Sequence, residues 1–174
     1  GPVVAAAVIL PKDYQHVLLN DSKQLSKDER QVLQTDIVRD ALAWAVAEVS
    51  NIEIDSINIL NASFKAMHLA LDQLSIRPQF LLIDGNRFKP YSNIPFQCVI
   101  KGDGAYLSIA AASVLAKNYR DDLMSKLSEQ YPGYGWHTYV GYPTEEHREG
   151  IRMLGITPYH RKSFQLLPSQ LELF

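Results

Sequence analysis

The sequence LLIDGN occupies residues Leu81–Asn86, and VIKGDG follows at Val99–Gly104. Short apolar runs that stop at a glycine are typical of buried strands ending in a turn. The carboxylates of Asp84 and Asp103 are therefore expected at the mouth of a sheet, where open α/β folds bind ligands. Asp-Gly and Gly-Asp-Gly are also common turn formers, so either aspartate alone is explained by a turn without function. Two such strand ends together favour a metal site.

Composition indicates one globular domain. The chain has 174 residues, of which 47% are hydrophobic and 21% are charged, enough to bury one core. We expect a single domain over residues 1–174, with a helical and tail portion from about residue 144. The net charge of −2 argues against a protein that coats nucleic acid through bulk positive charge. Any contact with nucleic acid must therefore be local.

No segment has the pattern of a membrane span or a signal peptide. The apolar run Val3–Leu10 lacks a basic flank and a cleavage-site pattern, so it is interpreted as a strand. The single cysteine, Cys98, cannot form a disulfide within the chain and is interpreted as a small core residue. These features predict a protein of the reducing cytoplasm without membrane attachment.

Strand and helix patterns alternate along the chain. The capping-box sequence Ser26–Glu29 predicts the start of a helix, and Leu33, Ile37 and Ala41 repeat every four residues on one face of it. Strands are predicted at Pro2–Leu10, Trp44–Val49, before Asp84 and up to Ile100, and helices at Ser26 to about Leu42, about Asp55 to Leu74, and Tyr106 to Leu127. The expected fold class is α/β, with a mixed sheet flanked by helices.

The segment Ser108–Lys117 (SIAAASVLAK) places small residues on successive turns of the last predicted helix. Small side chains let a helix approach a sheet closely and leave room for a substrate. Arg120 and Asp121 follow on the same helix, and such a pair usually forms a solvated or ion-paired face. Asp121 is kept as a candidate residue that supports the ligands of a site without contacting the substrate or metal itself.

Taken together, these motifs resemble the type 2 ribonucleases H, or ribonucleases HII, of bacteria. The similarity covers nearly the whole chain. It rests on segments in the family's order: residues 1–10 (GPVVAAAVIL), 20–26 (NDSKQLS), 57–60 (INIL), 83–86 (IDGN), 100–103 (IKGD), 108–117 with Arg120 and Asp121, 141–144 (GYPT) and 160–164 (HRKSF).

The resemblance implies an endonuclease that cuts the RNA strand of RNA–DNA hybrids and nicks duplex DNA 5′ of an embedded ribonucleotide. In the family four carboxylates hold two divalent metal ions, and Asp84 and Asp103 match the third and fourth of these. Two metals can activate the attacking water and stabilise the departing oxygen. Oxygen ligands suit Mg²⁺ or Mn²⁺, and the five histidines show no paired spacing that would favour zinc.

The same resemblance implies that part of the site is missing from this sequence. The family's first strand ends in Asp-Glu-Ala-Gly-Arg-Gly, just upstream of the segment that matches Gly1–Val4. That motif supplies the other two metal carboxylates and a loop that reads the ribose 2′-hydroxyl, and its strand is central in the sheet. We therefore expect the fold to lack its central strand and the 174-residue chain to be inactive or nearly so.

Several nucleic-acid contacts follow from the resemblance. Lys23 matches a lysine that approaches a phosphate, and Tyr142 matches a tyrosine that stacks near the ribose–deoxyribose junction. Arg161 is a candidate phosphate ligand, and Lys101 is a phosphate contact or a partner that keeps Asp103 ionised. Without the resemblance, a solvated loop is the better explanation of Lys23 and Arg161, and turn packing is the better explanation of Tyr142. Bacterial relatives carry a lysine where this chain has Val140, which predicts weaker and less salt-dependent binding.

Two other functions stay open at this point. One is a catalytically dead remnant that binds hybrids through Lys23, Tyr142 and Arg161. The other is an unrelated nucleotide-binding protein that uses the Gly102–Gly104 loop, although the sequence has no Walker or dinucleotide glycine pattern. We expect a monomer, with hybrid and ribonucleotide-containing duplexes as partners. A sliding clamp is a further candidate partner, because residues Gln165–Phe174 are apolar and acidic.

Overall fold

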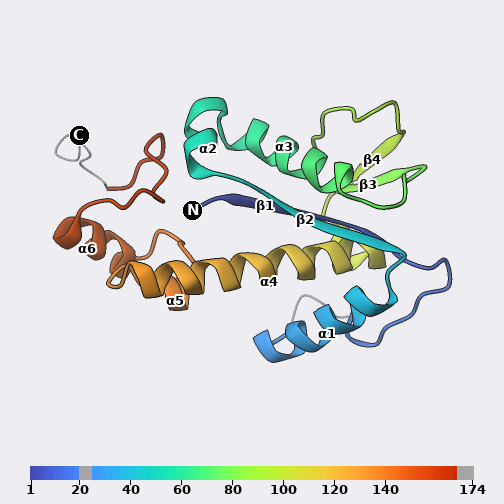
Figure 1. Cartoon of the computed structure of the whole chain (residues 1–174), viewed down its shortest axis with the longest axis horizontal. Coiled ribbons are helices and arrows are strands. Elements are labelled where there is room, and N and C mark those ends of the chain that lie inside the picture. Colours follow the sequence, from blue (N-terminus) through green and yellow to red (C-terminus); the bar gives the residue numbers. More distant parts are fainter. Residues whose placement is uncertain (20–24, 168–174) are drawn as a thin grey trace.

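The computed structural model describes residues 1–19 and 25–167 of the chain, and it has the expected α/β class (Figure 1). In chain order its elements are β1 (Val3–Ile9), α1 (Lys27–Asp40), β2 (Ala43–Val49), α2 (Asn51–Ile57), α3 (Ile59–Asp72), β3 (Leu81–Asp84), β4 (Phe96–Val99), the 3₁₀ turn η2 (Gly102–Gly104), α4 (Leu107–Gln130), α5 (Trp136–Tyr139) and α6 (Glu145–Leu154).

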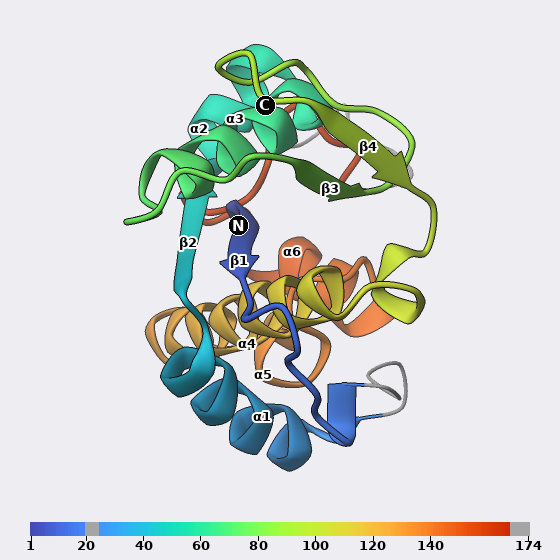
Figure 2. The same ribbon diagram turned by 90° about the vertical axis from the view of Figure 1, so that its right-hand side faces the viewer.

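The strands form two pairs. β1 and β2 are antiparallel, with Val3 opposite Val49. β3 and β4 are parallel, with Leu81 opposite Phe96. Parallel and antiparallel pairing are both present, as expected for a mixed α/β fold, but no hydrogen bonds join the two pairs within the described residues. Figure 2 shows β1 and β3 as the facing strands of the two pairs.

Helices cover both faces of the β1–β2 pair. α3 contacts both strands, and α4 packs against β1 and contacts β2. Because successive strand side chains point to opposite faces, Ala5 packs with Ile54 and Ala62 of the α2–α3 layer, whereas Ala6 joins the core formed by α1 and α4. β1 is thus the middle of a helix–strand–helix sandwich.

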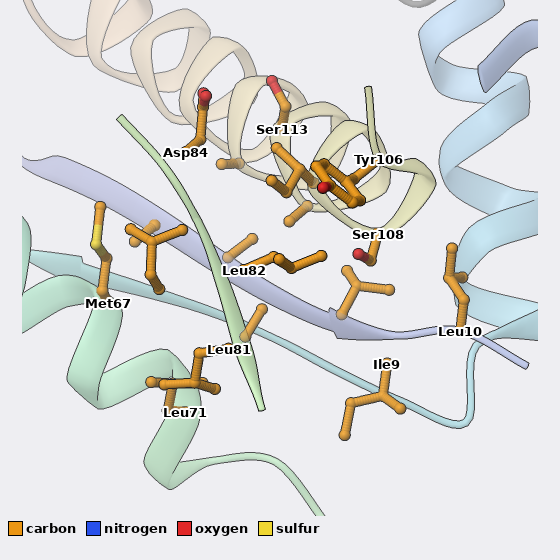
Figure 3. Close-up of a pocket in the computed structure, with 18 of the residues that line it drawn as sticks. Ile9, Leu10, Met67, Leu71, Leu81, Leu82, Asp84, Tyr106, Ser108 and Ser113 are labelled. Atoms are coloured by element: carbon orange, nitrogen blue, oxygen red, sulfur yellow. The ribbon is translucent and has the colours of Figure 1, made fainter. Parts of the chain in front are cut away.

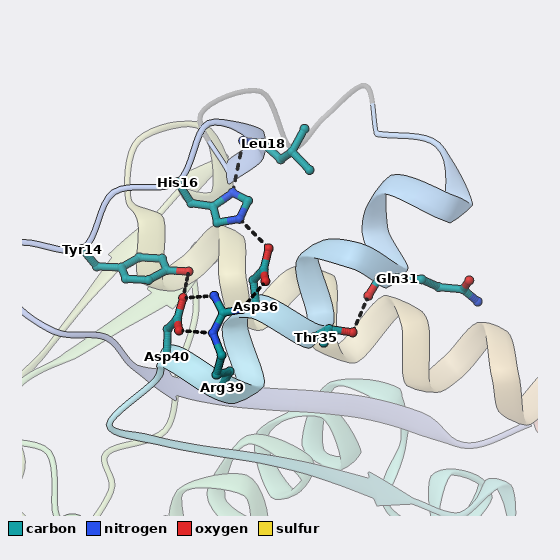
Figure 4. A network of polar contacts seen from close by, with 8 residues as sticks. All are labelled: Tyr14, His16, Leu18, Gln31, Thr35, Asp36, Arg39 and Asp40. Atoms are coloured by element: carbon teal, nitrogen blue, oxygen red, sulfur yellow. Dashed lines mark hydrogen bonds and ion pairs between the residues drawn. The ribbon is translucent and has the colours of Figure 1, made fainter.

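The first helix begins as its capping box predicts. The Ser26 side chain accepts a hydrogen bond from the Glu29 amide, and the Glu29 carboxylate accepts one from the Ser26 amide. α1 ends at Asp40, because Ala41 has an extended conformation. Polar contacts then join α1 to the loop after β1: Tyr14 hydrogen-bonds to Asp40, His16 to Asp36, and Arg39 to both aspartates (Figure 4).

The expectation of one helix from Asp55 to Leu74 was wrong. Two helices are present, separated at Asn58, whose φ of 66° interrupts the helical backbone. Asn tolerates this region better than most residues because its short polar side chain bonds locally, and here that side chain caps Asn61 of α3. Ser50 caps α2 in the same way through Glu53, so the helical region begins earlier than expected.

The C-terminal region contains a buried aromatic–histidine cluster that the sequence did not predict. It consists of Tyr134, Trp136, His147 and His160, all less than 9% exposed. The rings of Tyr134 and Trp136 stack with centroids 5.1 Å apart, and those of the two histidines stack at 5.2 Å. α6, capped by Thr144, supplies His147, and Met124 of α4 joins the surrounding core. None of the helices in the described residues has the length and apolarity needed to cross a membrane.

Candidate active site

The structure brings the two aspartates of the sequence prediction together. Asp84 is the last residue of β3 and is exposed, and Asp103 is the middle residue of η2, the turn that follows β4. Because β3 and β4 are parallel, their carboxyl ends meet at one edge. The Asp84 Oδ1 atom accepts a hydrogen bond of 3.0 Å from the Gly102 amide, so the turn that carries Asp103 is tied directly to Asp84.

The backbone around Asp103 explains the glycines of the motif. Lys101 is exposed and left-handed, with φ of 55°. Gly102 is buried, and a Cβ atom there would lie 2.5 Å from Ile109 Cδ1 on α4. A side chain at this position would therefore displace the Ile109 side chain. Gly85, directly after Asp84, has φ of 120°, a conformation that favours glycine.

A cavity of about 1100 Å³ opens beside Asp84. Its walls are β1, β3, α3 and the first half of α4, with Met67 and Leu71 on the α3 side (Figure 3). Most of this lining is apolar. Among the polar residues of the lining, Asp84 comes from β3 and Ser113 from α4, as Figure 3 shows.

The α4 wall of the cavity carries the candidate residue Asp121 together with polar residues that the sequence did not single out. Ser113, Lys117 and Arg120, spaced four and three residues apart on the helix, line the cavity with it. Ser113 and Lys117 are exposed. The signal was present in the small-residue segment Ser108–Lys117, whose expected close approach to the strands is seen as the packing of α4 on β1.

Asp121 lies in an ion pair. Its Oδ2 atom accepts a 2.8 Å hydrogen bond from Arg30 of α1, and both side chains are 13% exposed. Arg30 also donates to Asn118 and to the Leu25 carbonyl. Asp121 therefore joins α4 to α1 while one side of it faces the cavity.

Tyr142 is available to a ligand. It is 62% exposed and lines the same cavity as Asp84. It follows a tight turn, in which its amide donates to the Tyr139 carbonyl at 2.9 Å. The structure thus brings Asp84, Asp121 and Tyr142 to one cavity, and Lys101 and Asp103 flank Gly102, whose amide is hydrogen-bonded to Asp84.

Arg161 is not part of the cavity lining. Its guanidinium donates to the carbonyls of Gly1 and Pro2 and stacks over the Phe164 ring, 4.9 Å from its centroid. Burial, followed by the nearby Arg120 charge, lowers the Arg161 pKa from its ordinary value, and Asp55 partly opposes this. The predicted phosphate ligand Lys23 lies outside the described residues.

The fold is that of an α/β protein of the ribonuclease H-like class. The crystal structure of ribonuclease H2 from Pyrococcus horikoshii OT3 has the same fold, with a TM-score of 0.75 at 24% identity over 95% of this chain and 90% of that one. The ribonuclease HII in a complex with PCNA from Archaeoglobus fulgidus gives a TM-score of 0.73 at 23% identity, over 93% and 85% of the two chains.

The chain belongs to the ribonuclease HII family. The family model described as Ribonuclease HII matches residues 1–167. A ribonuclease HII of Parabacteroides distasonis is 63% identical over 173 residues, which is 99% of this chain and 87% of the relative. The resemblance seen in the sequence is confirmed, and with it the assignment to a family of nucleases that hydrolyse phosphodiester bonds.

Proposed function

We propose that this protein cuts the RNA strand of RNA–DNA hybrids and nicks duplex DNA 5′ of single embedded ribonucleotides, with Asp84 and Asp103 as metal ligands. The observation that carries the proposal is the hydrogen bond from the Gly102 amide to Asp84 Oδ1. It holds two carboxylate-bearing segments together at the edge of the parallel strand pair, beside a cavity open to a substrate.

The donor atoms suit Mg²⁺ or Mn²⁺. Both side chains offer hard carboxylate oxygens, which these two ions prefer. Within the described residues no group of three or more His, Cys, Asp and Glu side chains could hold a metal ion, so the two aspartates form only part of a metal site. Bound there, a pair of such ions would supply an activated water and charge stabilisation for the departing oxygen. The chain's own contribution is positional, since Asp84 and Asp103 are fixed before substrate arrives.

Two carboxylates are half of the set that two metals require. The cavity offers a position for a segment that carries the other two. Within the described residues β1 pairs only with β2, and β3 only with β4. Their facing edges line the apolar cavity, and unpaired backbone groups beside apolar walls favour an added strand. We assign this space to a strand that bears the remaining two carboxylates. The 174-residue chain without it is then inactive or nearly so.

The remaining residues of the proposed site contact the sugar and phosphates of the nucleic acid. Tyr142 stacks on the sugar at the ribose–deoxyribose junction, a contact worth about 1–3 kcal/mol. Lys101, exposed beside η2, binds backbone phosphate, and Lys23, which lies outside the described residues, does the same. Arg161 supports the start of β1 through its two backbone contacts and is the weakest of the proposed phosphate ligands.

A nicking assay tests the proposal. The substrate is a labelled DNA duplex with one ribonucleotide, incubated with Mn²⁺ or Mg²⁺. The chain alone should give little or no cleavage, and addition of a peptide strand ending in Asp-Glu-Ala-Gly-Arg-Gly should produce nicking that Asp84→Asn removes. Robust nicking by the chain alone would contradict the two-carboxylate argument. Nicking that survives Asp84→Asn would contradict the proposed metal site.

The second candidate function is a hybrid-binding protein without catalysis, favoured by the exposure of Tyr142 beside the cavity. Binding measured in a chelator separates the two. Unaltered hybrid binding, with no cleavage even after the strand peptide is added, would support the second function and contradict the first.

We further propose that the protein acts as a cytoplasmic monomer and that its C-terminal tail binds a sliding clamp. The support for a clamp is the solved complex of the Archaeoglobus fulgidus ribonuclease HII with PCNA. Light scattering of the chain alone tests the monomer. Titration with a bacterial clamp, using a chain shortened after Leu167 as the control, tests the tail. Equal affinity with and without the tail would contradict this part of the proposal.

A further inference from the structure

The turn that precedes Tyr142 is strained. Val140 has φ of 42° and ψ of 37°, and Gly141 continues with φ of 82°. A β-branched residue in the left-handed region is unusual, because its two γ carbons crowd the backbone. Such a conformation persists only where surrounding contacts determine it. The contacts around Val140 therefore show what holds the turn.

The side chain of Arg120 on α4 makes one of these contacts. One terminal nitrogen of its guanidinium donates to the Val140 carbonyl at 3.0 Å, and the other donates to the Pro2 carbonyl at 2.9 Å. One side chain thus joins three parts of the molecule: the start of β1, the middle of α4 and the turn. The planar guanidinium presents its donors at fixed angles, which a lysine ammonium cannot reproduce.

The next turn of α4 supports the same segment. A Cβ atom at Gly141 would lie 3.1 Å from Met124 Cε and 3.6 Å from an Arg120 terminal nitrogen. Met124 is buried and stands four residues after Arg120, on the same helix face. The Val140 amide also donates to the Trp136 carbonyl at 3.0 Å. The turn is held at its amide, at its carbonyl and along the surface of Gly141.

Tyr142 depends on this arrangement, because it has few contacts of its own. Its side chain is 62% exposed, and its amide bonds to Tyr139 across the strained turn. Arg120, Val140 and Tyr142 all line the cavity that contains Asp84. A change in the turn would therefore move the Tyr142 ring relative to Asp84.

We propose that Arg120 is a positioning residue for substrate recognition: it holds the left-handed turn at Val140–Gly141 and so fixes Tyr142 over the cavity. This inference rests on the proposed function, in which Tyr142 contacts the ribose–deoxyribose junction. Arg120 itself is half-buried, donates to two backbone carbonyls and acts through Tyr142.

The first test measures the turn directly, without nucleic acid. Hydrogen exchange of the Tyr142 amide is followed by NMR in the full chain and in Arg120→Gln, with Lys126→Gln as a control that removes a positive charge from the same helix. Arg120→Gln should speed exchange at Tyr142 by about tenfold or more, and Lys126→Gln should leave it unchanged. Equal exchange in the chain and in Arg120→Gln would overturn the proposal.

A second variant keeps the test decisive if Arg120→Gln fails to fold. Asparagine adopts the left-handed region more readily than valine, so Val140→Asn should relieve strain without adding charge. It should slow exchange of the Tyr142 amide and reduce the effect of Arg120→Gln in the double variant. Faster exchange in Val140→Asn would show that the turn is not under the strain proposed.

A double-mutant cycle then connects the turn to recognition. Binding to a duplex with one ribonucleotide is measured for Tyr142→Ala, Arg120→Gln and both together. Tyr142→Ala should weaken binding on the order of tenfold, Arg120→Gln should weaken it severalfold, and the double variant should resemble Tyr142→Ala alone. A full additional loss in the double variant would overturn the inference. Unaltered binding by Tyr142→Ala would contradict the proposed function itself.

Discussion

The aromatic–histidine cluster and the edge that carries Asp84 are opposite in construction. In the cluster, Trp136 and His160 are 2% and 3% exposed and pack ring against ring. At the edge, Asp84 and Lys101 are exposed, and Asp84 has one hydrogen bond from the backbone. The buried cluster stabilises the fold, whereas the exposed edge leaves polar groups open to a ligand. Stability and chemistry are therefore located in different parts of the molecule.

The largest expected effect of a substitution is in the cluster. Trp136→Ala should lower the free energy of unfolding by about 3–5 kcal/mol, because it removes a buried ring and leaves a cavity. Urea unfolding measures the change. The other tryptophan, Trp44, is 42% exposed on β2, so Trp44→Ala is the matched control and should cost much less. Similar losses at both positions would contradict the contrast between the two regions.

The second-largest expected effect is a loss of stability in acid, through the histidines of the cluster. Burial, and then the nearby His147, lower the His160 pKa to about 4, and burial also lowers that of His147. The unfolded chain takes up these protons near pH 6.5, so stability is complete above that pH and falls as the pH drops towards 4. For His160 alone the loss approaches about 3 kcal/mol. Urea unfolding between pH 7 and 4 measures it.

The control for the pH series is His160→Phe, which keeps a ring in the cluster but removes a titrating group. Its stability should depend less steeply on pH than that of the unaltered chain. His137→Gln, at an exposed position, should leave the slope as it was. If His160→Phe and the unaltered chain have the same slope, the histidines are not the groups that respond to acid.

An intermediate effect is expected at the contact between α1 and α4. Arg30→Ala removes three hydrogen bonds and leaves the largely buried carboxylate of Asp121 without its cation. We expect a loss of about 2–3 kcal/mol in the free energy of unfolding. A double-mutant cycle with Asp121→Asn should show positive coupling, and additive losses would contradict the importance of the pair.

The smallest expected effect is at Asp84. Asp84→Asn should change the free energy of unfolding by less than about 1 kcal/mol, because the side chain is exposed and an amide oxygen can still accept from Gly102. Thermal unfolding measures it. A large destabilisation would mean that Asp84 contributes to folding as much as to chemistry.

The same division explains what sequence could predict. Local patterns identified the capping box at Ser26 and the two strand-end aspartates, because these signals lie within a few neighbouring residues. The early start of α2 also had a local signal, since Ser50 and Glu53 have capping-box spacing, but the continuous helical pattern concealed both that start and the division at Asn58.

The cluster and the Arg120 contacts had no such signal. Tyr134 meets His160 across 26 residues of chain, and Arg120 reaches Pro2 across 118. Neither pair has a periodic pattern, so only the packing of α4 against β1 and the C-terminal segments brings them together. Arg120 was visible in the sequence as one half of an Arg-Asp pair. The two residues nevertheless have different partners: Arg120 donates to the Pro2 and Val140 carbonyls, and Asp121 accepts from Arg30.

The bond between Gly102 and Asp84 has a consequence for motion. One carboxylate oxygen is attached to the backbone one residue before Asp103, so the two aspartates behave as neighbouring points on a single rigid body although 19 positions separate them. Thermal displacement of one should be correlated with displacement of the other. The spacing between the carboxylates would then be preserved even while the two strand pairs shift relative to each other.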